Sequence, residues 1–240
     1  MSFYTASVGA RQQQERLNVQ ANNIANVNTG GFKAEKPSFA QLMYGNVNGI
    51  NNAQLPRGSG TRMVMADTDF AQGPTMTTGM AQDYAIQGDG FFALVDPATN
   101  DISYTRDGSF TLSQCHILDE EGQPKTVYRL SDGQGRFVLS REGGLIDVAD
   151  GAAEQPVGVF DFAHVDGMQH VGGNRFVPVE KNGQVRMGSG KVQRGVLEAS
   201  NTDLAYEMSK IIEAQRSFSY ALKMVQTSDE VETTINNLRT

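Results

Sequence analysis

The residues of this chain that could carry out chemistry are few, and their spacing does not favour it. The histidines are His116, His164 and His170, and the last two lie six positions apart around Asp166. A metal site built on them would need a third ligand, for which Asp161 or Asp166 is a candidate, but the spacing matches no metal-binding motif. The pattern favours exposed loop histidines, and we expect no metal site and no cofactor.

The remaining chemical candidates are equally weak. Cys115 precedes His116 and could be an activated thiol, but a lone cysteine in a strand-rich segment favours an inert buried residue. Gly88-Asp89-Gly90 lacks the Lys-Ser/Thr of a phosphate loop and is typical of a turn that enters a strand. Glu120 and Glu121 fall in a predicted turn, where water would solvate them. We therefore expect no catalytic residues and no enzyme activity.

Composition narrows the classes of partner. The 240 residues suffice for one large or two small domains, and 39% hydrophobic with 20% charged residues is typical of a folded chain. A net charge of -7 argues against nucleic acid, whose phosphates require clustered Lys and Arg. The longest apolar run, Phe91 to Val95, is too short to cross a bilayer. No removable secretion signal is visible, so we expect any export to use another route, and we expect no small-molecule substrate.

The first zone, residues 1–44, is predicted to hold a helix followed by an extended segment. Gly30 and Gly31 follow Asn28-Thr29 and would stop the helix, because glycine tolerates the left-handed turn that closes a helix end. Apolar residues recur every seven positions and form a helical seam at Phe3, Ala10, Leu17 and Ile24, with Ala21 on the same face.

The last zone, residues 197–240, is predicted to be a long helix, because no Pro or Gly occurs from Glu198 to Thr240. Ser200, Asn201 and Thr202 are the candidates for its N-cap, with Asp203 in the first turn. Its seam repeats at Leu204, Ile211, Phe218 and Val225, with Met208 and Leu222 at the alternate positions and Gln215 as an interruption.

Between the ends the period changes to two. Residues 45–82 lack a clear period and are interpreted as an extended or partly β connector. Residues 83–196 alternate apolar and polar residues between glycine-containing turns such as Asp107-Gly108 and Asp132-Gly133, a pattern typical of antiparallel strands. The predicted fold class is α+β, in which N- and C-terminal helices form a coiled coil and an antiparallel β-rich body is inserted between them.

The second helix carries more apolar surface than one partner can cover. Ile212 is adjacent to Ile211 and points about a third of a turn away from it. The residues that widen the apolar belt beyond the seam are Ala205, Ala214, Tyr220, Ala221 and Met224. We expect neighbouring copies of the chain to cover this belt, and copies related by a rotation that does not close form open helical polymers. The alternative is an ordinary intramolecular helix pair beside a β domain.

The amide side chains of the two helices could have either of two roles. Either they are solvated, or some are buried and fix the register between helices. For Gln215 the choice is between a hydrogen bond to asparagines of the facing helix and an exposed edge of the seam. The asparagines concerned are Asn18, Asn22, Asn23, Asn26 and Asn28.

Segments along the whole chain resemble one protein family. The run from Ala21 to Lys33 closely resembles the N-terminal signature of bacterial flagellar basal-body rod and hook proteins, and Leu197–Leu204 with Glu213–Phe218 resembles the C-terminal one. Gln87–Phe92, Tyr104–Phe110 and Gly172–Phe176 look like the β-body motifs of that family. The family positions that match here are Asn22, Asn23, Asn26, Gly31, Phe32, Gly88, Asp89, Gly90, Phe91, Phe92, Ser200 and Asn201.

The resemblance implies a structural subunit of the flagellar rod, with a helical coiled coil inside a tube that transmits torque from motor to hook and β domains outside. It implies export by the flagellar type III apparatus and, as partners, copies of the chain, other rod subunits, the hook protein and basal-body ring proteins. The pattern looks closest to the distal rod subunit, with the proximal rod subunit nearly as close. Two alternatives from other classes are a secreted cell-wall hydrolase, which would need a carboxylate pair or a metal triad, and a monomeric binding module.

Overall fold

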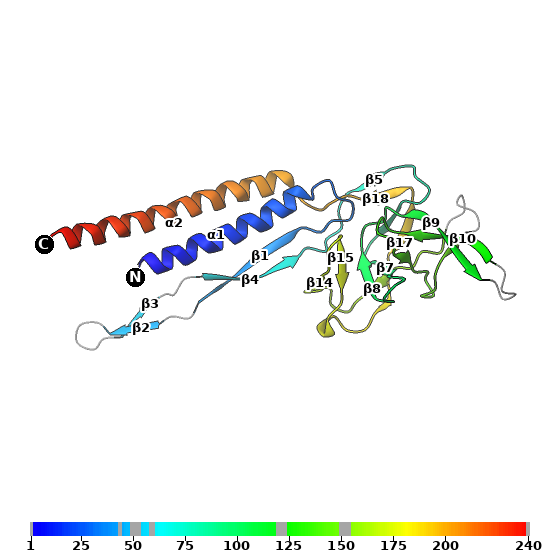
Figure 1. Ribbon diagram of the computed structural model, residues 1–240, viewed down its shortest axis with the longest axis horizontal. Coiled ribbons are helices and arrows are strands. Elements are labelled where there is room, and N and C mark those ends of the chain that lie inside the picture. The colour runs from blue at the N-terminus through cyan, green and yellow to red at the C-terminus, as the bar shows by residue number, and fades with distance from the viewer. Residues whose placement is uncertain are drawn as a thin grey trace. The chain divides into compact units, whose positions relative to one another are not determined.

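The computed structural model describes residues 2–42, 45–48, 54–57, 61–118, 124–148 and 155–238. The chain divides into two compact units, which we call the helical unit and the β unit (Figure 1). The helical unit consists of Met1–Ala25, Glu35–Asp67 and Asp203–Thr240, and the β unit consists of Asn26–Ala34 and Thr68–Thr202.

Two helices dominate the helical unit. They are α1, Ser2–Ala25, and α2, Leu204–Leu238, which lie side by side and antiparallel (Figure 1). The same unit holds two pairs of strands, in which β1 pairs with β4 and β2 pairs with β3. The bounds are Glu35–Gln41 for β1, Gly45–Asn48 for β2, Gln54–Arg57 for β3 and Thr61–Thr68 for β4. Much of the predicted connector is therefore β structure.

The helix ends differ in detail from the prediction. The α1 helix ends at Ala25, before Asn28, because the Thr29 N–H donates to the Asn26 carbonyl at 3.1 Å and closes a turn there. At α2 the N-cap is Asp203, and the capping role predicted for residues 200–202 is wrong. The Asp203 carboxylate accepts from the N–H groups of Ala205 and Tyr206 at 2.9 and 3.2 Å, which are the orphan donors that an N-cap satisfies.

The β unit is built from short antiparallel strands, as the period-two pattern predicted. Its largest sheet has the order β12-β10-β11-β7-β8-β15-β14, with β9 paired to β10. The pairs β13-β16, β17-β6 and β18-β5 are separate. The bounds are β5 Thr75–Thr77, β6 Tyr84–Gln87, β7 Phe92–Val95, β8 Ile102–Thr105, β9 Thr111–Leu118, β10 Pro124–Ser131, β11 Phe137–Val138, β12 Asp147–Val148, β13 Phe160–Asp161, β14 Gln169–His170, β15 Arg175–Val177, η2 Glu180–Asn182, β16 Arg186–Met187, β17 Lys191–Arg194 and β18 Val196–Glu198.

Two hydrophobic cores form in the β unit. Phe92 and Leu94 of β7 belong to one core and Ala93 to the other, because successive side chains of a strand point to opposite faces. Edge-to-face ring contacts stabilise both cores, with centroids 5.2 Å apart for Phe92–Phe110 and 4.8 Å apart for Tyr104–Phe162.

The residues considered for chemistry do not come together. Cys115 is half-buried in β9, and its nearest polar contact is the Ser113 carbonyl at 4.0 Å, whereas the His116 ring bonds the Thr126 hydroxyl. His164 and His170 are exposed, as predicted, but only His164 lies in a loop, because His170 belongs to β14. Among the described residues, no three acidic, histidine or cysteine side chains are grouped to hold a metal ion, and no helix is both long and apolar enough to cross a membrane.

Candidate assembly surface

The face of α2 that packs on α1 has small or polar residues at every second position. Six of its buried and half-buried residues alternate in steps of four and three, a spacing that keeps one face of a helix toward a partner. They are Glu207, Ile211, Ala214, Phe218, Ala221 and Val225. Ala214 is completely buried, and its small side chain allows the two helices to approach closely.

The predicted seam overlaps this face only in part. Ile211, Phe218 and Val225 lie on it, but Leu204, Met208, Gln215 and Leu222 are exposed. The difference arises because Glu207, Ala214 and Ala221 take the alternate positions. On α1, Ala10 is buried, Leu17 and Ile24 are half-buried and Ala21 is exposed, and the side chain of Phe3 lies outside the described residues. Gln215 is at an exposed edge and bonds to no described residue of α1.

One asparagine fixes the register of the helix pair. Asn23 is completely buried, and its amide nitrogen donates to the Glu207 carboxylate at 2.9 Å and to the Glu35 carbonyl at 2.8 Å. Its amide oxygen accepts from the Glu35 N–H at 2.9 Å. Burial raises the pKa of Glu207, and the Asn23 hydrogen bond opposes this shift. Asn18, Asn22 and Asn28 are exposed, so the register role falls to one of the five asparagines.

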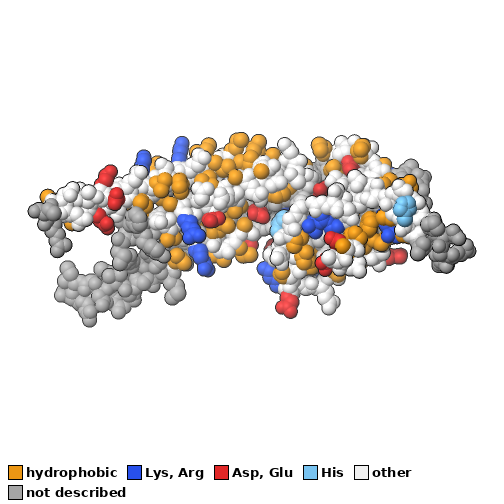
Figure 2. All heavy atoms as spheres, in the orientation of Figure 1, with side chains coloured by type: hydrophobic (Ala, Val, Ile, Leu, Met, Phe, Trp, Pro, Cys, Tyr) orange, Lys and Arg blue, Asp and Glu red, His pale blue; other side chains and the backbone are white. Residues whose placement is uncertain are grey.

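Both flanks of α2 carry large apolar residues that are exposed. At 100° per residue, Leu204, Met208, Ile212 and Leu222 lie on one flank of the packed face, and Tyr206, Tyr220 and Met224 lie on the other. Met208 is 52% exposed and Tyr220 is 64% exposed. The space-filling view shows hydrophobic side chains gathered over the helices (Figure 2). The side opposite α1 carries Ser209, Arg216, Lys223 and Thr227, so large apolar residues occur on three of the four sides of α2.

A buried ionic cluster lies in the β unit. The Glu198 carboxylate accepts from Lys33 Nζ at 2.6 Å, from Arg106 Nη1 at 3.2 Å and from the Gly73 N–H at 2.8 Å. The side chains of Lys33 and Glu198 are 0% exposed, and that of Arg106 is 4% exposed. Burial lowers the pKa of Lys33, and Glu198 opposes the shift. Lys33 also donates to the Ala71 carbonyl and Arg106 to the Gly88 carbonyl, each at 2.8 Å.

Gly31 allows the chain to reach this cluster. It has φ +61°, and a Cβ there would lie 2.4 Å from both the Arg106 carbonyl carbon and the Asp107 nitrogen. Its N–H donates to the Glu198 carbonyl at 2.7 Å. Because any side chain would push the two segments apart, glycine is required at this position.

The segments that carry the family resemblance meet around the cluster. The Asn201 side chain accepts from the Ala34 N–H at 2.7 Å and donates to the carbonyls of Asp69 and Ala71 at 2.7 and 3.1 Å. The Asn174 amide donates to the Gly30 carbonyl at 2.8 Å. Among the other motif positions, Phe32, Phe91 and Phe92 are buried and Asn26 is half-buried. Gly88 and Gly90 form a turn with φ of +101° and +126°, and Asp89 between them is exposed. The Ser200 hydroxyl bonds Thr202.

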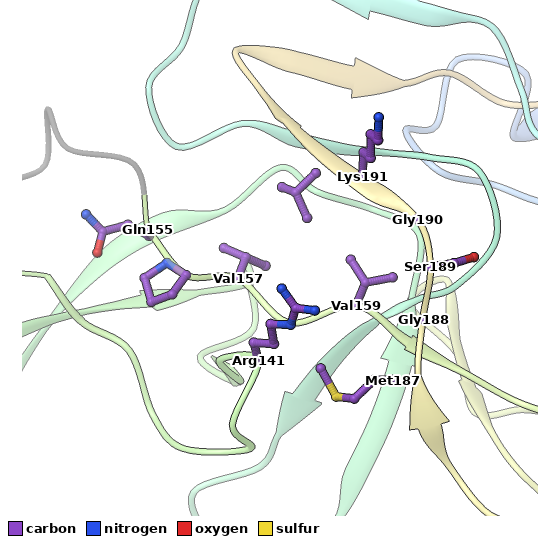
Figure 3. A pocket seen from close by; sticks show the side chains of 11 residues that line it. Arg141, Gln155, Val157, Val159, Met187, Gly188, Ser189, Gly190 and Lys191 are labelled. Carbon is purple, nitrogen blue, oxygen red and sulfur yellow. The ribbon is translucent and has the colours of Figure 1, made fainter.

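The β unit also has an open groove of about 780 Å³. Its described lining includes Arg141, Val157, Val159, Met187 and Lys191 (Figure 3). None of the described residues that line it is an Asp, Glu, His or Cys. The described lining therefore offers Ser189 and Lys191 no carboxylate, imidazole or thiol with which they could form a catalytic set.

Sequence reasoning did not select the three members of the ionic cluster as site residues. Lys33, Arg106 and Glu198 are far apart in sequence, and no local pattern pairs them. The available signal was the placement of a charged residue inside an otherwise apolar or glycine-rich motif, as with Lys33 after Gly-Gly-Phe.

Three family models match separate parts of the chain. Residues 3–33 match the family model described as flagella basal body rod protein, residues 85–127 match the flagellar hook protein FlgE/F/G D1 domain, and residues 193–238 match the flagellar basal body rod FlgEFG protein C-terminal model.

Curated relatives match nearly end to end. The flagellar basal-body rod protein FlgG of Borreliella burgdorferi is 31% identical over 99% of this chain and 98% of its own length, and FlgG of Bacillus subtilis shows the same identity and coverage. The flagellar basal-body rod protein FlgF of Caulobacter vibrioides is 33% identical over 91% of this chain and 89% of its own length.

Removing the carboxylate of the ionic cluster should destabilise the β unit strongly. Glu198→Gln leaves Lys33 and Arg106 buried without an anion, so the free energy of unfolding should fall by about 3–5 kcal/mol. Denaturant unfolding followed by circular dichroism measures this. Asp147→Asn, which removes a half-exposed carboxylate of the same unit that pairs with Arg129, is the control and should leave the midpoint nearly unchanged. A loss below about 1 kcal/mol for Glu198→Gln would contradict the role of the cluster.

Gly31→Ala should destabilise the chain more than a matched glycine replacement. Gly79 has φ +73° and open space around its Cβ position, so Gly79→Ala should show only the left-handed backbone cost of about 1 kcal/mol. Gly31→Ala adds overpacking against Arg106, for a total of about 3 kcal/mol. Equal unfolding free energies for the two variants would refute the proposed close approach.

Glu207 should make the stability of the helical unit depend on pH. Its folded-state pKa is raised above the ordinary 4.5, so its favourable contribution is complete below that pH and is lost as the pH rises through the folded pKa. Glu207→Gln removes this titration. The unfolding free energy of the unmodified chain minus that of Glu207→Gln should therefore decrease from pH 4 to pH 7, and a difference that increases over this range would show that the sign is wrong.

Proposed function

Because this chain belongs to the family of flagellar basal-body rod proteins, we propose that it is a structural subunit of the distal rod that assembles with its own copies into a helical tube. The relatives are named as rod proteins, and the chain is a structural protein rather than an enzyme. The observation that carries the assembly proposal is the uncovered apolar surface on both flanks of α2.

The packing of α1 and α2 supports a coiled-coil role. A helix with large apolar residues on three sides is buried against several neighbours in its working state, and here one neighbour is α1 of the same chain. In the assembled rod, the two remaining apolar flanks would contact helices of adjacent copies. Interlocked helices in the tube wall resist twisting, so such a tube transmits torque from motor to hook.

The β unit suits the outer part of such a tube. Its two aromatic cores and its buried ionic cluster make it a rigid body, and a rigid body passes on force without absorbing it by local unfolding. We place its contacts with copies of the chain, with other rod subunits, with the hook protein and with ring proteins on this outer part. Export through the flagellar type III apparatus belongs to the same proposal.

The proximal rod is the second candidate location. The similarity to a differently named rod protein, FlgF, at 33% identity favours keeping it. Electron microscopy of basal bodies isolated from a strain that lacks the gene separates the two locations. A distal subunit predicts rods that stop short of the hook, and a proximal subunit predicts basal bodies without most of the rod.

A charge placed on either flank of α2 should block assembly without unfolding the chain. Met208→Glu and Met224→Glu each add a carboxylate to one flank, and both positions are exposed, so the unfolding free energy should change by less than about 0.5 kcal/mol. In a strain that lacks the native gene, both variants should be absent from purified basal bodies, and the cells should not swim.

Thr227→Glu is the matched control, because it adds the same charge on the polar side of α2. It should support normal motility. Basal bodies that contain the Met208→Glu and Met224→Glu variants at the native level would rule out the flanks of α2 as assembly contacts.

A further inference from the structure

The end of α2 extends past the part of the helix that faces α1. Asn23 contacts Glu207 and Arg16 contacts Glu213, so residues of α1 and α2 that face each other have numbers that add to about 230. In this register Ser2, where α1 begins, lies opposite residue 228 or so. Every described side chain from 229 to 238 is exposed, as expected for a helix that continues past its partner. We call residues 229–238 the α2 tip.

The α2 tip is acidic and amphipathic. It carries Asp229, Glu230 and Glu232 and contains no Lys or Arg. Its large apolar residues are more exposed than most others in the chain, at 52% for Val231, 58% for Ile235 and 83% for Leu238. A segment of this kind fits a groove that is apolar at its floor and basic at its rim.

The helical unit has such a groove between α1 and β4. It has a volume of about 470 Å³, and Val8, Leu42 and Met63 supply its apolar surface. The Gln12 side-chain oxygen accepts from the Met63 N–H at 2.5 Å and ties the two walls together.

The rim of this groove is basic. Arg11 and Arg62 are exposed beside it, and neither forms an ion pair with any residue that the structure describes. Glu15 also lines the groove and leaves a net charge of one positive unit among the described lining residues.

We propose that this groove receives the α2 tip of a second copy of the chain, with its three carboxylates beside Arg11 and Arg62. The proposal rests on the function proposed above and specifies one contact of the polymer. The tip cannot reach the groove of its own chain, because residues 8–15 of α1 lie opposite residues 215–222 or so of a continuous helix and the tip points away from them.

The contact also predicts how the copies are displaced. The centre of the tip lies about 15 residues beyond the part of α2 that faces the groove, which is ~22 Å at 1.5 Å per residue. Parallel copies joined in this way are therefore offset by ~22 Å along the helix axis. The contact pairs two different surfaces, so it does not close a dimer and it extends into an open polymer.

Charge reversal with rescue tests the contact. Arg11→Glu combined with Arg62→Glu places like charges together and should lower the amount of the chain in purified basal bodies by about tenfold or more. Adding Glu230→Lys and Glu232→Lys to that variant should restore most of the loss. Arg216→Glu with Lys223→Glu makes the same change in charge on the polar side of α2 and should have no effect.

Crosslinking identifies the occupant. In a Cys115→Ser background, Thr61→Cys at the groove and Thr233→Cys in the tip should be joined by a short bis-maleimide into a ladder of covalent multimers in isolated basal bodies. Each single cysteine, and Thr61→Cys paired with Ser209→Cys, should give no ladder. A crosslink within one chain, or to a different protein, would overturn the assignment to a second copy.

The outcomes separate this inference from the proposed function. If the chain is present in basal bodies but shows no ladder and no effect of charge reversal, the groove contact is wrong and the rod function stands. If the unmodified chain is absent from basal bodies, the proposed function itself fails.

Discussion

The Glu198 carboxylate is the point at which distant parts of the chain are held together. Lys33 lies after α1, Arg106 directly follows β8, and Glu198 ends β18, and the three side chains share one buried site. Burying two cations and one anion costs free energy, and an apolar substitute of similar volume often gives equal or greater stability. What the ions supply is selectivity, because a misplaced segment would leave a charge buried without a partner. Gly31 completes the arrangement, since only a residue without Cβ lets the backbone pass so close to Arg106.

The helix pair buries polar residues beside apolar ones and leaves large apolar residues exposed. Between α1 and α2 lie Asn23, Glu207 and Ala214, whereas Met208 and Tyr220 face outward. In a finished globular protein the larger apolar residues would be inside. The polar contact sets the register of the two helices and contributes little hydrophobic stabilisation, so the apolar surface remains free for other contacts. A single chain is therefore incompletely buried, and association with further helices is the change that would cover this surface.

Local signals made the β unit easy to predict and the helix pair harder. Alternation and glycine-containing turns are properties of short segments, so the antiparallel strands predicted within residues 83–196, such as β8 and β10, are present. In α2 the seven-residue repeat correctly located Ile211, Phe218 and Val225 on the packed face. The residues between them were harder to assign, because the small side chain of Ala214 gives little hydrophobic signal. The ionic cluster was beyond sequence reasoning, because Lys33 and Glu198 are 165 positions apart and their pairing depends on the tertiary fold.

An exposed apolar helix is an aggregation hazard, and the charges of the chain limit that hazard. The net charge of -7 makes copies repel one another, and the carboxylates of the α2 tip concentrate part of this repulsion at the end of the helix. Salt screens such forces beyond about 8–10 Å, so they act only when two helices are close. When two copies are that close, most relative positions of their helices bring acidic groups together. The proposed position instead places the carboxylates of the α2 tip beside Arg11 and Arg62 of the other copy. Hydrophobic attraction along α2 is not directional, and the placement of charge is what can select one arrangement among the many that would bury the same area.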